Sequence, residues 1–184
     1  MGRLILITGG ARSGKSSYAL RRGEEIPGQR CFLATCPTVD AEMAQRILKH
    51  RIEREGRGWH CIEEETDIAA QLDRSALFGI MLVDCLTLWV NNLLFQAEKS
   101  STVFTEDKMQ QECDNLLASV HRYPGTVICV TNEVGLGIVP DNPLARHYRD
   151  LVGSCNRLLA SAAEEVILVS CGIPLVLKNN TANQ

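Results

Sequence analysis

Gly9-Gly10-Ala11-Arg12-Ser13-Gly14-Lys15-Ser16 has the spacing G-x-x-x-x-G-K-[ST] of a phosphate-binding loop. An apolar run, Leu4–Thr8, precedes this octapeptide, and a segment with helical character, Ser17–Glu25, follows it. A strand, a glycine-rich turn and a helix in this order are the context that the motif requires. We therefore expect all eight residues to contact the phosphates of a nucleoside triphosphate.

The chemistry of such a loop follows from its residue types. Glycines let the backbone curl until successive N–H groups point at one phosphate, and the N-terminus of the next helix adds partial positive charge. Lys15 is expected to neutralise the β- and γ-phosphate oxygens and to be catalytic. Ser16 is expected to place its hydroxyl on Mg²⁺.

Strand-like and helix-like segments alternate along the rest of the chain, which predicts an α/β fold with a mostly parallel, doubly wound sheet and helices on both faces. We expect one P-loop nucleotide-binding domain over residues 1–184, with a flexible tail from about residue 179. The expected strands after the first are Arg30–Thr35, Gly79–Asp84, Thr126–Thr131, Val166–Ser170 and Leu175–Leu177, the last two around Gly172-Ile173-Pro174. The expected later helices are Ala41–Glu55 with an Asp40 cap, Leu86–Ala97, Glu106–His121 and Asn142–Ala163.

Polar residues follow several of these strands directly. Lys15, Thr35, Asp84 and Glu133 all come just after strands, and parallel sheets bind ligands at the carboxyl ends of their strands. Asp84 ends an apolar strand as a Walker B acid does, so we expect it near Mg²⁺, through a water or Ser16. Glu133 has two open roles: it orients an attacking hydroxyl or it holds the Gly135–Gly137 loop.

The expected helix 41–55 carries Arg46, His50 and Arg54 four residues apart, so the three lie along one helix face. A neutral imidazole between two arginines is suited to attack a phosphorus atom. The spacing alone, however, favours a plain solvated basic face in which His50 has no chemical role.

Composition excludes some function classes. The formal net charge of −3 lacks the basic surplus of a nucleic-acid-binding protein, and no apolar run is long enough to span a membrane. The eight cysteines never form C-x-x-C and several lie in apolar runs, which is typical of buried thiols in a reducing compartment. We expect a cytoplasmic enzyme with no nucleic-acid partner and no integral membrane segment.

Three stretches together resemble one family. They are ITGGARSGKS at residues 7–16, RILKHRIER at 46–54 followed by Trp59, and TNEVGLGIVPDNPLARHYRD at 131–150. The combination resembles the bifunctional adenosylcobinamide kinase / adenosylcobinamide-phosphate guanylyltransferases of cobalamin biosynthesis. The resemblance implies phosphorylation of adenosylcobinamide by ATP or GTP, then transfer of GMP from GTP through a guanylylated histidine to give adenosylcobinamide-GDP.

The family's site residues carry over by motif. The pattern R-I-x-x-H-R points to His50 as the guanylylated histidine. The resemblance also implies a RecA-like fold, Mg²⁺, a corrinoid substrate and a homo-oligomer, a trimer in this family. Beyond the phosphate loop, the implied nucleotide contacts are Thr35, Cys36, Pro37, Arg51, Ile52, Glu53, Arg54, Asp84 and one acid after the tryptophan, for which Glu63 fits best beside Glu64 and Glu65.

Two other hypotheses stay open from the sequence. One is a simple P-loop kinase of a small molecule, in which His50 is never modified. The other is a RecA-like ATPase or nucleotide switch that moves a partner, against which the acidic charge balance counts.

Overall fold

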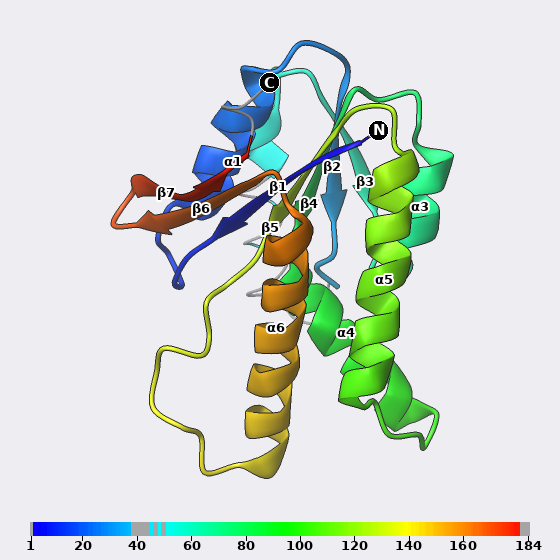
Figure 1. Cartoon of the computed structure of the whole chain (residues 1–184). Coiled ribbons are helices and arrows are strands. Elements are labelled where there is room, and N and C mark those ends of the chain that lie inside the picture. The colour runs from blue at the N-terminus through cyan, green and yellow to red at the C-terminus, as the bar shows by residue number, and fades with distance from the viewer. Residues whose placement is uncertain (1, 38–44, 46–47, 49–50, 181–184) are drawn as a thin grey trace.

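The computed structural model describes residues 2–37, 45, 48 and 51–180. Figure 1 shows a sheet with helices packed on both sides of it. Its elements, in chain order, are β1 (Arg3–Thr8), α1 (Lys15–Glu24), β2 (Arg30–Ala34), β3 (Trp59–Glu63), α3 (Ile68–Arg74), β4 (Ile80–Asp84), α4 (Leu86–Lys99), α5 (Glu106–Arg122), β5 (Thr126–Val130), α6 (Pro143–Ala162), β6 (Glu165–Ser170) and β7 (Ile173–Asn179).

The sheet has the strand order β3-β2-β4-β5-β1-β6-β7. Every neighbouring pair is parallel except β6 and β7, which form an antiparallel hairpin at one edge. The phosphate-loop strand β1 lies between β5 and β6, and β4 lies on the far side of β5. This confirms the predicted mostly parallel α/β sheet.

Alternating side chains of each strand build two separate cores. Leu4 and Leu6 of β1 face the core formed with α3, α4, α5 and α6, whereas Ile5 and Ile7 face the core formed with α1. Successive residues of a strand point to opposite faces, so a strand covered on both sides is apolar throughout. The prediction of helices on both faces is therefore confirmed.

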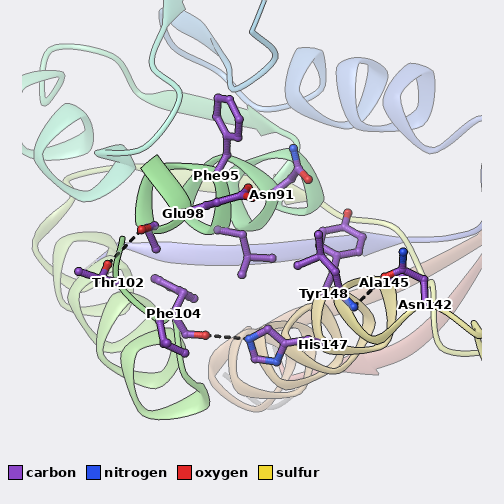
Figure 2. Close-up of a pocket in the computed structure, with 13 residues that line it drawn as sticks. Asn91, Phe95, Glu98, Thr102, Phe104, Asn142, Ala145, His147 and Tyr148 are labelled. Atoms are coloured by element: carbon purple, nitrogen blue, oxygen red, sulfur yellow. Dashed lines mark hydrogen bonds between the residues drawn. The ribbon is translucent and has the colours of Figure 1, made fainter. Parts of the chain in front are cut away.

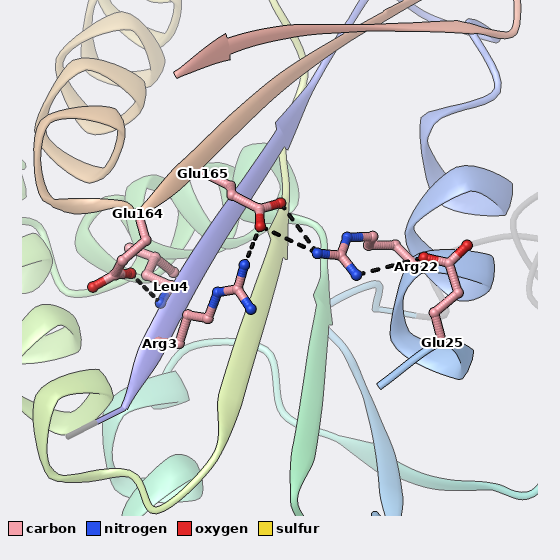
Figure 3. A network of polar contacts seen from close by, with 6 residues as sticks. All are labelled: Arg3, Leu4, Arg22, Glu25, Glu164 and Glu165. Atoms are coloured by element: carbon pink, nitrogen blue, oxygen red, sulfur yellow. Dashed lines mark hydrogen bonds and ion pairs between the residues drawn. The ribbon is translucent and has the colours of Figure 1, made fainter. Parts of the chain in front are cut away.

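An ion-pair network fixes α1 against the amino ends of the strands (Figure 3). Glu165, at the start of β6, pairs with Arg3 of β1 and accepts hydrogen bonds from Arg22 of α1 at 3.1 and 3.4 Å. Glu164 beside it accepts a hydrogen bond from the backbone N–H of Leu4 at 2.7 Å. Both β1 and α1, which flank the phosphate loop, are thus tied to the same strand.

The structure corrects two expectations. The first concerns the region between β2 and β4, where both the strand β3 and the helix α3 are absent from the predicted elements. The Asp67 cap of α3 accepts from the backbone N–H of Ala70 at 3.2 Å, a short local signal in a polar region. The second concerns the hairpin: Ile173 and Pro174 belong to β7, and the turn is Cys171–Gly172. Both turn residues have positive φ, 52° and 78°, as a two-residue hairpin turn requires.

Other boundaries agree closely. Asn142 caps α6 by accepting from the N–H groups of Leu144 and Ala145, and Pro143 occupies the first helical position. Of the expected helix 41–55, residues 45, 48 and 51–54 are helical; Asp40, Arg46 and His50 lie outside the described residues. β7 runs to Asn179, the first residue of the expected tail.

All eight cysteines lie in the described part of the chain, and no disulfide joins any of them. Among the described residues, no helix has the length and apolar character needed to cross a bilayer.

The two-core packing predicts unequal effects of leucine truncation. Leu6 is 1% exposed, so Leu6→Ala should lower the free energy of unfolding by about 2 to 5 kcal/mol, because it removes core contacts and leaves a cavity. Leu77 is 69% exposed, so Leu77→Ala should change it by no more than about 0.5 kcal/mol. Denaturant titration of both variants measures the difference, and equal losses would contradict this packing.

Candidate nucleotide site

The phosphate loop joins β1 to α1, and no side chain of the described residues caps the N-terminus of α1. The helix cap is Gly14, whose φ of 91° lies in the left-handed region that favours glycine. The first N–H groups of α1 therefore point out of the helix beyond β1, where an anion would find both hydrogen-bond donors and the positive end of the helix dipole.

Close backbone approach explains the first glycine. A Cβ atom on Gly9 would lie 2.3 Å from the carbonyl oxygen of Val169, in the neighbouring strand β6. The Ser13 hydroxyl lies next to the same position, is buried, and has no hydrogen-bond partner among the residues that the structure describes. A phosphate oxygen would give it one, so this residue fits the ligand that the motif predicts.

Lys15 crosses the loop and donates a hydrogen bond from Nζ to the Gly10 carbonyl at 3.0 Å. Burial lowers the pKa of Lys15, while the nearby Asp84 opposes that effect by favouring the charged ammonium. The ammonium is therefore held, largely desolvated, between the loop and the end of β4, where an anionic ligand would compensate its charge.

Ser16 and Asp84 are the expected magnesium ligands. Ser16 lies half-buried in the first turn of α1, and Asp84 ends β4 next to the Lys15 ammonium. No group of three or more His, Cys, Asp or Glu side chains suited to a metal occurs among the described residues. One hydroxyl and one carboxylate fit Mg²⁺ held mainly by substrate phosphates and water.

Neighbouring segments hold the loop in shape from both sides. The N–H of Glu133 donates to the carbonyl of Gly9 at 3.1 Å, and the N–H of Gly172 donates to that of Ser13 at 2.8 Å. The Glu133 carboxylate accepts a hydrogen bond from the N–H of Gly135 at 3.0 Å. Of its two open roles, this contact favours holding the Gly135–Gly137 loop.

Thr35, after β2, is fully buried. Its hydroxyl donates to the carbonyl of Cys85 at 2.8 Å and accepts from the N–H of Cys85 at 2.7 Å, and its own carbonyl accepts from Asn92 of α4. Cys36 and Pro37 follow it and are partly exposed. The hydroxyl thus fixes the end of β2 against the end of β4.

The described end of the His50-bearing segment brings two predicted contacts together. Arg51 and Glu63, at the end of β3, form an ion pair, and both side chains are exposed. Arg54 behaves differently: it is buried, with its guanidinium 3.7 Å from the centroid of the Phe32 ring. Stacking over the ring leaves the in-plane N–H donors of Arg54 available, and its Nε has no hydrogen-bond partner among the residues that the structure describes.

The carboxylate of Glu64, beside Glu63, has contacts of its own. The Glu64 carboxylate accepts hydrogen bonds from the N–H groups of Thr66 and Asp67 at 2.9 and 2.8 Å. Burial tends to raise the pKa of Glu64, but these hydrogen bonds outweigh it and lower the pKa. Glu64 therefore holds the approach to α3, which favours Glu63 over Glu64 as the nucleotide contact.

A polar latch ties this segment to the far end of α1. Glu24 accepts hydrogen bonds from the Trp59 indole at 2.9 Å and from Arg57 at 2.8 Å. Gly23 is required beside it, because a Cβ there would lie 2.7 Å from the Trp59 ring. The chain thus leaves the carboxyl edge of the sheet at Pro37 and is anchored again at the amino edge, with His50 in between.

A groove of about 610 Å³ lies between α4 and α6 (Figure 2). Its lining is mainly apolar, with Phe95, Phe104 and Leu144, and no sequence-predicted site residue that the structure describes lines it. His147 on its wall is bonded through Nε2 to the carbonyl oxygen of Phe104 at 2.7 Å. A second groove, of about 430 Å³, shares Asn91 and Phe95 with the first and extends to Pro37.

Sequence reasoning missed the residues that support the site. Gly172 donates a hydrogen bond to Ser13 of the phosphate loop, and Asn92 donates one to the carbonyl of Thr35 at the end of β2. Both donors lie far from their partners in the sequence. The sequence indicates Gly172 only as part of a turn, and a single asparagine within a helix carries no signal of its partner.

Comparisons with known proteins point to one family. The family model described as cobinamide kinase / cobinamide phosphate guanyltransferase matches residues 5–177. The bifunctional adenosylcobalamin biosynthesis protein CobU of Salmonella typhimurium is 42% identical over 185 residues, covering 95% of this chain and 99% of that protein. CobU of Escherichia coli is 40% identical, with 95% and 99% covered, and CobP of Pseudomonas aeruginosa is 39% identical, with 94% and 96% covered.

Two solved structures share the fold at 16% identity. The flagellar accessory protein FlaH of Methanocaldococcus jannaschii has a TM-score of 0.55, with 98% of this chain and 80% of that chain covered. A KaiC-like protein of Pyrococcus horikoshii has a TM-score of 0.54, with 100% and 82% covered. This likeness in fold agrees with the predicted α/β class.

The burial of Lys15 predicts a pH dependence of stability. Because the folded-state pKa of Lys15 is lowered, the unfolded chain binds more protons between that pKa and the ordinary value of 10.5. The free energy of unfolding of the wild type, relative to Lys15→Met, should therefore rise with pH through this window and be constant below it. Denaturant titrations of both proteins across this range test the sign; a difference that is flat or falls would contradict the burial of a charged Lys15.

Proposed function

This chain belongs to the cobinamide kinase / cobinamide phosphate guanyltransferase family, and we propose that it performs both transfers at one nucleotide site beyond the carboxyl ends of the strands. The family match over residues 5–177 carries this proposal. It is a bifunctional enzyme of cobalamin biosynthesis, as its relatives are named, and the resemblance seen in the sequence is confirmed. A single phosphate-binding motif over the whole chain supports one shared site.

In the kinase step, a hydroxyl of the cobinamide attacks the γ-phosphorus of ATP or GTP, and the bond to the bridging oxygen breaks. Phosphoryl transfer is mainly a matter of positioning and charge neutralisation. The N–H groups of the loop and the N-terminus of α1 hold the phosphates, and Lys15 balances the charge that develops on them. Ser16 and Asp84 would hold Mg²⁺, which would supply further neutralisation of the phosphate oxygens.

In the guanylyl step, a neutral ring nitrogen of His50 attacks the α-phosphorus of GTP. The P–N bond forms as the bond to pyrophosphate breaks, and pyrophosphate leaves with the electron pair. An oxygen of cobinamide phosphate then attacks the same phosphorus, the P–N bond breaks, and GDP-cobinamide forms. His50 lies outside the described residues, so its role rests on the R-I-x-x-H-R motif and the family.

The ion pair of Arg51 with Glu63 supports a nucleotide-binding role for the segment that follows His50. The pair is exposed, so either partner can exchange it for a ligand at small cost. Thr35, Cys36 and Pro37 lie at the neighbouring strand end, where Cys36 and Pro37 are accessible to a nucleotide and Thr35 fixes the backbone.

Exposed apolar residues support a homo-oligomer, and the family resemblance implies that this oligomer is a trimer. The edge strand β7 exposes Ile173, Leu175, Val176 and Leu177, and the loop after β5 exposes Leu136 and Ile138. Exposed apolar residues clustered on an edge strand are typical of a protein interface. The cysteine pattern and the net charge of −3 support a cytoplasmic enzyme without a nucleic-acid partner.

The covalent step predicts position-specific labelling. With Mg²⁺ and GTP labelled at either the α- or the γ-phosphate, the wild type should retain only the α-label, as an acid-labile, alkali-stable phosphoramidate. His50→Ala should retain none, whereas His121→Ala, which alters an exposed histidine on α5, should label as the wild type does. Undiminished label in His50→Ala would refute the assignment, and absence of label from the wild type with phosphoryl transfer intact would leave a plain kinase.

A further inference from the structure

The segment that follows β5 continues the sheet onto the phosphate loop. The N–H of Thr131 donates to the carbonyl of Ile7 at 2.9 Å, and the N–H of Glu133 donates to the carbonyl of Gly9 at 3.1 Å. Any displacement of residues 131–133 would therefore move the carbonyls that shape the loop. β5 itself ends at Val130, so the segment depends on these two bonds and on side chains outside the sheet.

Asn156 of α6 holds it with both ends of one amide. Its Oδ1 accepts a hydrogen bond from the Thr131 hydroxyl at 2.7 Å, and its Nδ2 donates to the carbonyl of Asn132 at 3.0 Å. Thr131 is fully buried, and Asn156 lies on the face of α6 that packs against the sheet beside Val152, Cys155 and Leu159. An amide bonded in both directions fixes the position of this backbone in a way that apolar packing would not.

The contact continues to the end of β4. Asn132 donates from Nδ2 to the hydroxyl of Thr87 at 2.9 Å, and that hydroxyl also contacts the thiol of Cys85 at 2.9 Å. Tyr148, on the same helix as Asn156, donates to the carbonyl of Thr87 at 3.1 Å. Cys85 directly follows Asp84, so the chain of contacts links the exits of β4 and β5.

The same helix holds the other end of the loop that starts at Glu133. Arg146 donates from Nη1 to the carbonyls of Pro140 and Asp141 at 2.8 and 2.7 Å. α6 thus anchors the loop at both stems, while the residues between them, such as Ile138, are almost fully exposed. The loop can therefore change at its tip without moving the stem next to the phosphate loop.

From these contacts we propose that Asn156 is a positioning residue for phosphoryl transfer: it fixes residues 131–133 against the phosphate loop and the end of β4. The expected effect of Asn156 on turnover rests on the proposed function, whereas its effect on the backbone of residues 131–133 is independent of that function. Loss of the clamp should reduce the rate of transfer more than the affinity for nucleotide, because the loop keeps its N–H donors and Lys15 while their alignment with the reacting phosphate becomes less exact.

Asn156→Asp tests the clamp with an almost unchanged shape. The carboxylate still accepts from Thr131, but it cannot donate to the carbonyl of Asn132 and places a negative charge beside it. Asn115→Asp is the matched control, because Asn115 lies on the exposed face of α5. Circular dichroism and thermal unfolding establish that each variant is folded at the assay temperature.

Amide hydrogen exchange gives the readout that is independent of activity. In Asn156→Asp, peptides that cover residues 131–135 should exchange about tenfold faster or more than in the wild type, because the N–H groups of Thr131, Glu133 and Gly135 donate the bonds that open more readily. The same peptides should be unchanged in Asn115→Asp. Unchanged exchange in folded Asn156→Asp would overturn the proposal, even if the wild type proved inactive on cobinamide and the proposed function failed.

Steady-state kinetics with GTP and cobinamide give the second readout. The kcat of Asn156→Asp should fall by about tenfold or more while the KM for GTP stays within about twofold. The loss should shrink as the pH falls, because the introduced carboxyl, once protonated, regains the donor to Asn132, a behaviour that a general loss of packing would not produce. Wild-type kcat in the folded variant, or a loss equal at every pH, would refute the positioning role.

Discussion

The phosphate loop keeps its anion-binding shape because backbone hydrogen bonds hold it from both neighbouring strands. Glu133 and Gly172 donate to the carbonyls of Gly9 and Ser13, so the loop is fixed on either side of its curl. A loop that had to order itself around each phosphate would lose conformational entropy at every binding event. Here that ordering is already part of the fold, and the strand order β5-β1-β6 provides it.

The helices on one face of the sheet hold the carboxyl ends of the strands with polar side chains as well as with apolar packing. Asn92 of α4 donates to the carbonyls of Thr35 and Glu65, and Trp89 donates to that of Thr66, so α4 fixes the exits of β2 and β3. Asn156 of α6 does the same for the exit of β5. Buried polar groups with every partner in place define one arrangement of the backbone. The strand exits are thus set by residues that never need to touch the nucleotide.

Much of this was predictable because the signals are local. The loop motif, its flanking strand and helix, and the apolar strands of a sheet covered on both faces can each be read from contiguous residues. The cap of α3 at Asp67 is also local, but the helix has only seven residues, follows a run of acids, and carries Ile68 and Leu72 as its one buried apolar pair. Placing Ile173 and Pro174 in the turn overlooked that Cys171 and Gly172 form a complete two-residue turn.

The long-range contacts were not predictable from one sequence. The spacing predicts that Arg54 shares a helix face with His50, yet its guanidinium packs on the Phe32 ring. Only the fold brings Arg54 and Phe32 together. Asn156 lies 25 residues from Thr131, and nothing in either neighbourhood indicates the pairing. Function was accessible mainly through the resemblance of whole motifs, since spacing alone favoured a solvated basic face around His50.

The central claim is that one phosphate loop serves both transfers. The most direct test is mass spectrometry of folded Lys15→Met after incubation with GTP, Mg²⁺ and cobinamide, measuring the GMP adduct on the enzyme and the phosphorylated corrinoid together. A shared loop predicts that both products fall together by about a hundredfold or more relative to the wild type. A guanylylated enzyme at the wild-type level, with corrinoid phosphorylation lost, would contradict the claim and require a second nucleotide site.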